Sequence, residues 1–240
     1  MSPKRAIWQW LQRQADVSEA SCRDAMLVVC RRLAPLPAML DCGCGDGEFT
    51  AKMADVVEAT KIIGIDVAAE QIAVARTRGI EGIVGNLDLG LPFGNESVDL
   101  VVASHIIEHV SDTDMLLRES YRVLKHGGYV VMSTPNLAAF TNILFLILGK
   151  QPTIAEVSDV ALVGTWSPRG GEVARKGPAH RRIFTLAALK GLLQHYGFQC
   201  EKTVRSGFLP LPRWPARLAS ALLPRYASNI IIRARKPGQL

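Results

Sequence analysis

The feature that most constrains the fold of this chain is a glycine-rich loop between an apolar run and a helical pattern. The loop reads Gly43-Cys44-Gly45-Asp46-Gly47 and follows the apolar run Ala38–Cys42. Glycines at alternate positions let the backbone approach a ligand closely, because no Cβ atoms stand in the way. A glycine-rich loop between a strand and a helix is typical of nucleotide-binding α/β proteins, including dinucleotide enzymes.

The spacing of the glycines separates two kinds of ligand. Dinucleotide folds carry G-x-G-x-x-G and place a pyrophosphate on the helix N-terminus, whereas this loop reads G-x-G-x-G. Acidic residues also surround it, at Asp41, Asp46 and Glu48. Carboxylates there would repel a pyrophosphate, so they favour a ligand that carries an ammonium and a sulfonium.

A carboxylate at the end of the next apolar run gives the second signal. Asp66 follows Gly64 and Ile65 about 20 residues beyond the loop, where a strand-end carboxylate can accept hydrogen bonds from ribose hydroxyls. The alternative is an Asp that only caps the following helix. Behind this loop, the ribose role is favoured.

Short apolar runs alternate with helical patterns along most of the chain. Buried parallel strands read as continuous apolar runs, and alternation with helices implies right-handed βαβ units. We therefore predict an α/β fold with a doubly wound, mostly parallel, seven-stranded sheet. The expected strands are Ala38–Cys42, Ile62–Ile65, Gly82–Val84, Val98–Ala103, Tyr129–Ser133, Phe198–Val204 and Asn229–Ala234. The expected helices include one or two within 6–33, then 47–57, 68–78 and 112–125, and Thr185–Tyr196 with Thr185 as its N-cap.

Four segments in order carry a family resemblance. They read LDCGCGDGEF, GIDVAAEQIAVAR, GNLDLGLPFGNESVDLVVASHIIEHV and LLRESYRVLKHGGYVVMSTPN. Together they resemble class I S-adenosylmethionine-dependent methyltransferases, above all the group of ubiquinone, menaquinone and small-molecule enzymes. The resemblance covers residues 38–136 and, more weakly, residues 180–198. It implies a Rossmann-like fold and S-adenosylmethionine as the cofactor.

The resemblance also implies roles for particular residues. Asp66 would hold the ribose, Val67 would lie beside the adenine and Leu87 would pack near the ring. Asn86 stands where the family commonly has an Asp that meets the adenine amino group, and an Asn can accept the same bond. Ser104 ends the fourth strand, which faces the reactive end of the cofactor. The residues expected to line its methionine and ribose part are Asp41, Gly43, Cys44, Gly45 and Gly47.

Methyl transfer from a sulfonium needs the nucleophile about 3–3.5 Å from the methyl carbon, in line with the sulfur. The protein must therefore orient the acceptor and, for an O or N acceptor, remove a proton. We expect His105 or His180 to be that base or orienting group. A helical turn would place His105 and His109 on one face, since they lie four residues apart.

Some RNA and quinone methyltransferases of this fold have a similar cluster that binds a divalent metal. In this chain its counterparts would be His105, Glu108, His109 and His180, with His105 in place of a Glu. We expect no metal, because many metal-independent relatives share the Glu-His pair. The alternative stays open at this point.

We expect one domain over residues 1–240. Its parts would be N-terminal helices (1–36), the cofactor-binding core (38–136), an inserted lid (137–180) and a C-terminal helix with closing strands (181–240). Residues 137–149 are apolar and helical in pattern, whereas 150–180 read as a loop. An apolar helix and a loop over the strand ends can exclude water from the reacting methyl.

The charge is distributed unevenly along the chain. Residues 1–149 hold 13 basic and 18 acidic residues, for a net charge of −5, whereas residues 150–240 hold 15 and 4, for +11. The basic C-terminal part favours an anionic partner, either an acidic or lipid-linked acceptor or the surface of a membrane; the alternative is a solvated basic face. RNA is disfavoured, because aromatic residues are sparse.

The five cysteines fit neither a zinc site nor a disulfide framework. The longest apolar run, Leu137–Leu148, is too short to span a bilayer. We therefore expect a cytoplasmic protein with reduced thiols.

The expected function is methyl transfer to an O or N atom of a small-molecule or lipid-linked acceptor, which the residues do not identify further. Two alternatives belong to other classes. One is a non-catalytic protein that binds S-adenosylmethionine as a scaffold or activates a partner. The other is a nicotinamide-dependent oxidoreductase, which the glycine spacing disfavours.

Overall fold

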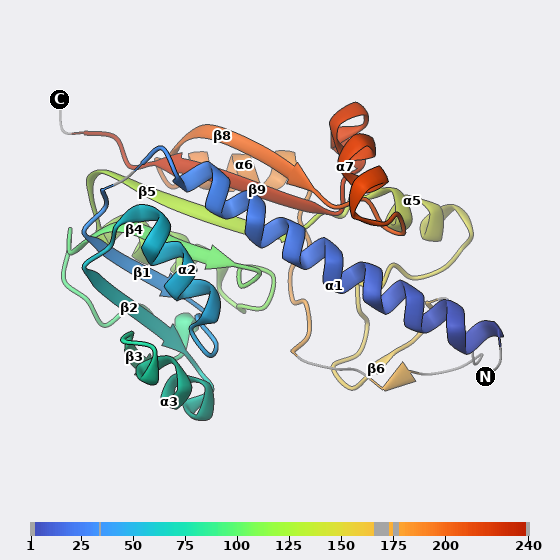
Figure 1. Ribbon diagram of the computed structural model, residues 1–240, viewed down its shortest axis with the longest axis horizontal. Coiled ribbons are helices and arrows are strands. Elements are labelled where there is room, and N and C mark those ends of the chain that lie inside the picture. Colours follow the sequence, from blue (N-terminus) through green and yellow to red (C-terminus); the bar gives the residue numbers. More distant parts are fainter. Residues whose placement is uncertain (1–2, 34, 166–172, 175–177, 239–240) are drawn as a thin grey trace.

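The computed structural model describes residues 3–33, 35–165, 173–174 and 178–238. A seven-stranded sheet in the order β3-β2-β1-β4-β5-β9-β8 runs through its centre (Figure 1). Strands β1 to β5 are parallel, and β9 is antiparallel to both of its neighbours. The predicted doubly wound sheet is therefore confirmed. The strands are β1 (Ala38–Cys42), β2 (Lys61–Asp66), β3 (Glu81–Val84), β4 (Val98–Ser104), β5 (Leu124–Pro135), β8 (Gln199–Ser206) and β9 (Asn229–Arg235).

Helices cover both faces of this sheet, which is why its central strands are mostly apolar. All five residues of β1 are buried. One face packs against α1 (Pro3–Cys30) and α2 (Glu48–Val57), and the other against α4 (Thr113–Val123) and α6 (Leu186–His195). Helix α3 (Ala69–Thr77) packs against β2 and β3. The N-terminal region forms a single long helix, one of the two arrangements expected there.

The strand order reverses between β1 and β4, which lie side by side in the sheet. Ligands of open α/β sheets bind at such a switch point, outside the carboxyl ends of the strands. The glycine loop after β1, Asp66 at the end of β2 and Ser104 at the end of β4 all lie at this edge. The topology therefore gathers the expected cofactor residues at one place.

The predicted capping of the penultimate helix is confirmed. The Thr185 hydroxyl accepts a hydrogen bond from the Ala188 amide at 3.3 Å, and Gly197 follows α6 with a left-handed φ of 87°. The Thr185 bond satisfies a helix-end amide, and the Gly197 amide donates to the Gln194 carbonyl oxygen at 3.0 Å, so each end of α6 gains a partner.

The segment between β5 and α6 contains more structure than the sequence indicates. Helix α5 (Phe140–Ile147) forms as expected. The prediction of a continuous loop over 150–180 is wrong at β6 (Ala161–Leu162), which pairs with β7 (Val173–Ala174). Two-residue strands are too short to produce a periodic pattern. Residues 166–172 and 175–177 of the expected lid lie outside the described residues.

Three short elements complete the described structure. Helix α7 (Arg213–Leu222) is as short as its flanking prolines require, and η1 (Leu87–Leu89) and η2 (Pro224–Tyr226) are single turns. Within the described ranges, every helix falls short of the length and apolar character needed to cross a bilayer.

Candidate cofactor and acceptor site

The three positions of the loop require glycine for different physical reasons. All have positive φ angles, 79° at Gly43, 54° at Gly45 and 79° at Gly47. A Cβ at Gly43 would lie 2.6 Å from Ile106, and one at Gly47 would lie 2.4 Å from Ile80. At Gly45 a Cβ would meet no atom of the protein within 4 Å. Two glycines therefore allow close packing, and the third borders open space where a ligand can approach.

Asp66 ties the glycine loop to the end of β2. Its Oδ2 accepts a hydrogen bond from the Gly45 amide at 2.9 Å, and its Oδ1 accepts one from the Ala68 amide at 3.0 Å. The second contact lies at the start of α3, as the helix-capping alternative predicts. Each carboxylate oxygen can accept a further bond, so both roles are compatible in one side chain.

Asp41 lies beneath the loop and is only 2% exposed. Its Oδ2 accepts a hydrogen bond from the Thr50 hydroxyl at 2.6 Å, whereas its Oδ1 has no partner among the described residues. Burial raises the pKa of the Asp41 carboxyl to about 7, although the Thr50 bond opposes the shift. A buried carboxylate oxygen without a partner fits a ligand that donates a hydrogen bond.

This raised pKa predicts a change of stability with pH. Between pH 3.8 and about pH 7, the Asp41 carboxyl of the folded protein holds a proton that the unfolded chain has released. Rising pH therefore destabilises the fold in this range. Asp41→Asn cannot titrate but can still accept the Thr50 bond. We expect the free energy of unfolding of Asp41→Asn to rise relative to that of the wild type across this pH window. Above the window, the difference between the two should stay constant. Urea denaturation at several pH values measures the difference, and a constant difference within the window would contradict the assignment.

The expected adenine side is more open. Val67 is 68% exposed, and Asn86 is exposed at the start of η1, where its Oδ1 accepts a hydrogen bond from the Asp88 amide at 3.0 Å. Leu87 is 6% exposed and packs in the core, which leaves little of it for a ring. Leu89, which the sequence analysis did not name, is 83% exposed beside it.

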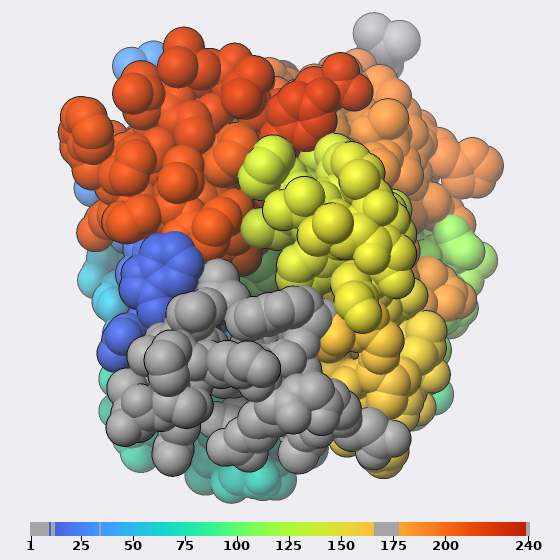
Figure 2. All heavy atoms as spheres, turned by 90° about the vertical axis from the view of Figure 1, so that its right-hand side faces the viewer, coloured from blue at the N-terminus to red at the C-terminus, as the bar shows by residue number. Residues whose placement is uncertain are grey.

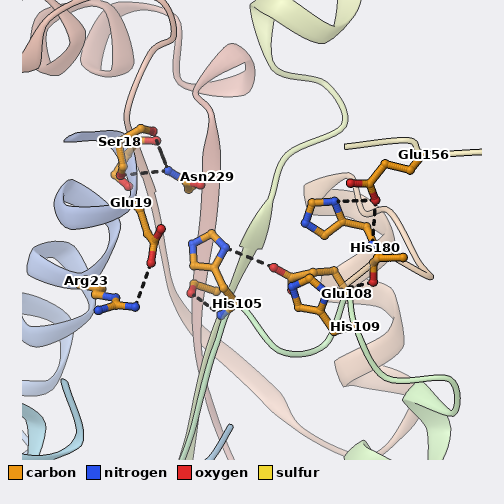
Figure 3. A network of polar contacts seen from close by, with 12 residues as sticks. Ser18, Glu19, Arg23, His105, Glu108, His109, Glu156, His180 and Asn229 are labelled. Atoms are coloured by element: carbon orange, nitrogen blue, oxygen red, sulfur yellow. Dashed lines mark hydrogen bonds and ion pairs between the residues drawn. The ribbon is translucent and has the colours of Figure 1, made fainter. Parts of the chain in front are cut away.

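The loop after β4 turns sharply at His105, which adopts a left-handed φ of 52°. Its Nδ1 lies 3.2 Å from Glu108 Oε1, whereas His109 extends to the other side of Glu108 (Figure 3). The expectation that His105 and His109 share one face is therefore wrong. The reason is that the helical turn begins only at Ile106, after the left-handed residue.

His105 and Glu108 form a buried charged pair. Burial would lower the pKa of His105, but the neighbouring Cys22 and Glu108 outweigh it and raise that pKa. Burial would raise the pKa of Glu108, but His105 outweighs it and lowers that pKa. A protonated imidazole cannot accept a proton, so His105 suits the orienting role better than the role of a base. Ser104 Oγ, one residue earlier, has no partner among the described residues.

His180 lies against His109 on the other side of Glu108 (Figure 3). The two rings stack with centroids 4.9 Å apart. His180 Nδ1 is 3.3 Å from Glu156 Oε2, and the same oxygen accepts a bond from the His180 amide at 2.8 Å. Glu156 escaped the sequence analysis, because a lone Glu in a loop 24 residues before its partner gives no signal.

Three of these side chains could hold a metal ion. Donor atoms of Glu108, His109 and His180 all lie within 4.8 Å of one another. Glu108 Oε2 is buried without a partner among the described residues, and His109 Nδ1 lies 2.9 Å from the Ala179 carbonyl oxygen. Contacts of this kind, with a carbonyl at His109 and a carboxylate at His180, orient the imidazole ligands of metals. The donor set thus fits a divalent cation, and His105 does not join it.

A cavity of about 390 Å³ borders this cluster. Its lining includes Glu156, Asp159, His180, Arg181 and Arg182. The Arg181 and Arg182 amides donate to the Glu108 carbonyl oxygen at 2.7 and 3.2 Å, which fixes this segment to the turn after β4. The cavity therefore combines a histidine with both charge signs, as a polar acceptor requires.

Comparisons with known proteins identify relatives of this chain. Residues 40–132 match the family model described as a methyltransferase domain. A probable S-adenosylmethionine-dependent methyltransferase of Mycolicibacterium smegmatis is 33% identical over 74% of this chain and 59% of that protein. The mitochondrial ubiquinone biosynthesis O-methyltransferase of Rattus norvegicus is 32% identical over 49% of this chain and 36% of its own length. The chain thus spans less than two thirds of either relative.

Solved structures support the fold. A Thermotoga maritima protein described as an S-adenosylmethionine-dependent methyltransferase, possibly acting on histamine, superposes with a TM-score of 0.59. It covers 95% of this chain and 99% of its own, at 18% identity. At this identity the likeness shows a shared fold.

Proposed function

The chain belongs to the class I S-adenosylmethionine-dependent methyltransferase family, and from this premise we propose that it methylates an O or N atom of a small-molecule or lipid-linked acceptor. The observation that carries the proposal is the open space at Gly45, whose amide donates a hydrogen bond to the Asp66 carboxylate. Bound there, S-adenosylmethionine supplies an activated methyl group.

Different residues at the strand ends would hold different parts of the cofactor. Asp66 would accept hydrogen bonds from the ribose hydroxyls, and the backbone at Gly45 would approach the methionine part. Asp41, Cys44 and Ser104 would line the same region, and Gly43 and Gly47 would let the loop pack closely beside it. Val67, Asn86 and the small exposed part of Leu87 would border the adenine. The protonated His105 would orient a carboxylate or carbonyl near the reacting centre, because it can only donate hydrogen bonds.

On the acceptor side, His180 removes the proton that an O–H or N–H nucleophile loses as its bond to the methyl carbon forms. The carboxylate of Glu156 faces Nδ1 at 3.3 Å, so it holds the ring in place and stabilises the imidazolium. The proton is taken by the ring nitrogen that does not face Glu156. General bases placed in this way contribute about 10²- to 10⁴-fold to rates.

A specific observation favours a metal-assisted version of the same reaction. Glu108 has a buried Oε2 without a partner among the described residues, and a carboxylate oxygen of Glu108 lies within 4.8 Å of donor atoms of His109 and His180. A divalent cation held there would polarise the acceptor oxygen as a Lewis acid. In that version His180 is a ligand rather than a base, and Glu156 orients it.

The basic side of the cavity supports an anionic or lipid-linked acceptor. Arg181 and Arg182 line it, and residues 150–240 carry a net charge of +11. The basic C-terminal part would then bring the protein to a membrane that holds such an acceptor.

Calorimetric titration with S-adenosylmethionine, S-adenosylhomocysteine and NAD tests the proposal. We expect micromolar binding of both adenosyl compounds and none of NAD. Binding of NAD alone would overturn the proposal in favour of an oxidoreductase. Binding of the adenosyl compounds without methyl transfer to any component of a broad extract would favour the non-catalytic scaffold.

A further inference from the structure

A second cavity lies between α1, β8 and α7, and no residue of the glycine loop is among its lining residues. It measures about 460 Å³, and its lining includes Asp24, Arg205, Ser206, Arg213, Arg217 and Ser220. Neither the cofactor residues nor the His180 cluster contribute to it. The binding of cofactor and acceptor therefore does not explain the polar residues of this cavity.

The charges in this cavity are unbalanced. Asp24, its only carboxylate, pairs with Arg213 at 2.6 Å. The guanidinium groups of Arg205 and Arg217 have no hydrogen-bond or ion-pair partner within the described part of the chain. Residues 202–240 contain eight basic residues and no acidic one. Two cationic groups thus remain available to an anion.

A buried hydroxyl adds a donor to the same place. Ser206 is 7% exposed, lines the cavity and has an Oγ without a partner among the described residues. A buried hydroxyl without a hydrogen bond is unfavourable, because the bonds it makes to water in the unfolded chain are not replaced. Two guanidinium groups and a hydroxyl donor match the oxygens of a phosphate.

Helix α7 presents an exposed apolar stripe directly beside these arginines. Trp214, Leu218 and Leu222 follow one another at intervals of four and are 77%, 52% and 70% exposed. Arg213 and Arg217 each precede a member of the stripe by one residue, so they flank it on the cavity side. A helix with an apolar stripe next to a basic one is suited to lie in a membrane interface.

Helix α5 extends the apolar surface. Its Phe140, Leu144 and Ile147 are 46%, 39% and 76% exposed, and the Phe140 ring stacks on Phe208, just before α7, at 5.9 Å. Helices α5 and α7 lie side by side at one end of the protein in both views (Figures 1 and 2). We call these six residues of α5 and α7 the apolar face. Residues 137–150 contain no acidic residue either.

We propose that the cavity between α1, β8 and α7 binds the phosphate group of an anionic phospholipid while the apolar face contacts its acyl chains. The adjoining apolar face is the reason to choose a lipid over a free phosphate. The lipid site itself does not depend on the proposed function. Its consequence does rest on that function: the protein would meet a lipid-linked acceptor at the membrane surface.

Co-sedimentation with phosphatidylcholine vesicles, with and without phosphatidylglycerol, tests this site on the whole chain. We expect at least tenfold stronger binding to the anionic vesicles, weakened by added salt. Arg205→Gln combined with Arg217→Gln should reduce that binding by roughly 25-fold, since each arginine near the surface contributes about fivefold. Leu218→Ser should reduce it by about tenfold, because an exposed Leu is then no longer inserted.

Arg118→Gln combined with Lys190→Gln is the matched control, because it removes the same charge from two exposed residues of α4 and α6, which cover the other face of the sheet from α1. Equal binding of the wild type to both vesicle types, or an equal loss in the control, would overturn the site. So would micromolar binding of inorganic phosphate without any vesicle binding, which would assign the cavity to a free phosphate compound. S-adenosylmethionine affinity, measured on the same variants, should not change, which separates a failure here from a failure of the proposed function.

Discussion

Replacing Asp66 by Ala is expected to weaken S-adenosylmethionine binding by about ten- to 150-fold for each ribose hydrogen bond lost. A hydrogen bond to a charged group contributes about 1.5–3 kcal/mol, and one carboxylate can serve both ribose hydroxyls. The substitution also removes the contact of Oδ2 with the Gly45 amide, which frees the loop that approaches the cofactor. Calorimetric titration measures the change directly.

Asp55→Ala is the matched control, because Asp55 is an exposed Asp on α2, outside the loop. It should leave the dissociation constant unchanged. Thermal denaturation of both variants separates a local effect from a loss of folding. Unchanged affinity in a folded Asp66→Ala protein would mean that the ribose lies elsewhere.

His180→Ala is expected to reduce the turnover number by about 10²- to 10⁴-fold while the affinity for S-adenosylmethionine stays the same. The reason is that His180 lines the proposed acceptor cavity, whose lining includes no residue of the glycine loop among the described residues. The assay follows labelled methyl transfer from S-adenosylmethionine into a mixed small-molecule and lipid extract. His195→Ala, at an exposed position at the end of α6, should retain full turnover.

Treatment with EDTA then distinguishes the two roles proposed for His180, general base and metal ligand. If it is the base, turnover survives EDTA, and Glu156→Gln slows the reaction by weakening the support of the imidazolium. If turnover disappears with EDTA and returns with a divalent cation, the Glu108, His109 and His180 cluster is a metal site. Full turnover of His180→Ala would contradict both roles.

The sheet and the cofactor edge could be predicted because their signals are local. Buried parallel strands produce continuous apolar runs, so β1 and β4 are visible without any knowledge of their neighbours. The glycine loop and Asp66 each combine with a strand end, and two such signals about 20 residues apart specify one edge of a sheet. The cap at Thr185 is equally local, since its partner is three residues away.

The acceptor side could not be predicted, because it depends on contacts between distant segments. Glu156 reaches His180 only after the segment following α5 folds back, and no periodicity marks that return. The orientation of His105 depends on a left-handed backbone that sequence patterns rarely reveal outside glycine. The unpartnered Oε2 of Glu108 likewise emerges from packing rather than from spacing.

The turn after β4 has a consequence for how such a protein can change over evolutionary time. The backbone carbonyl of Glu108 receives the amides of Arg181 and Arg182, so the segment that carries His180 is attached to the core through main-chain atoms. Main-chain contacts tolerate almost any side chain. The side chains of this segment can therefore change, and with them the proposed choice of acceptor, without loss of its main-chain attachment to the core.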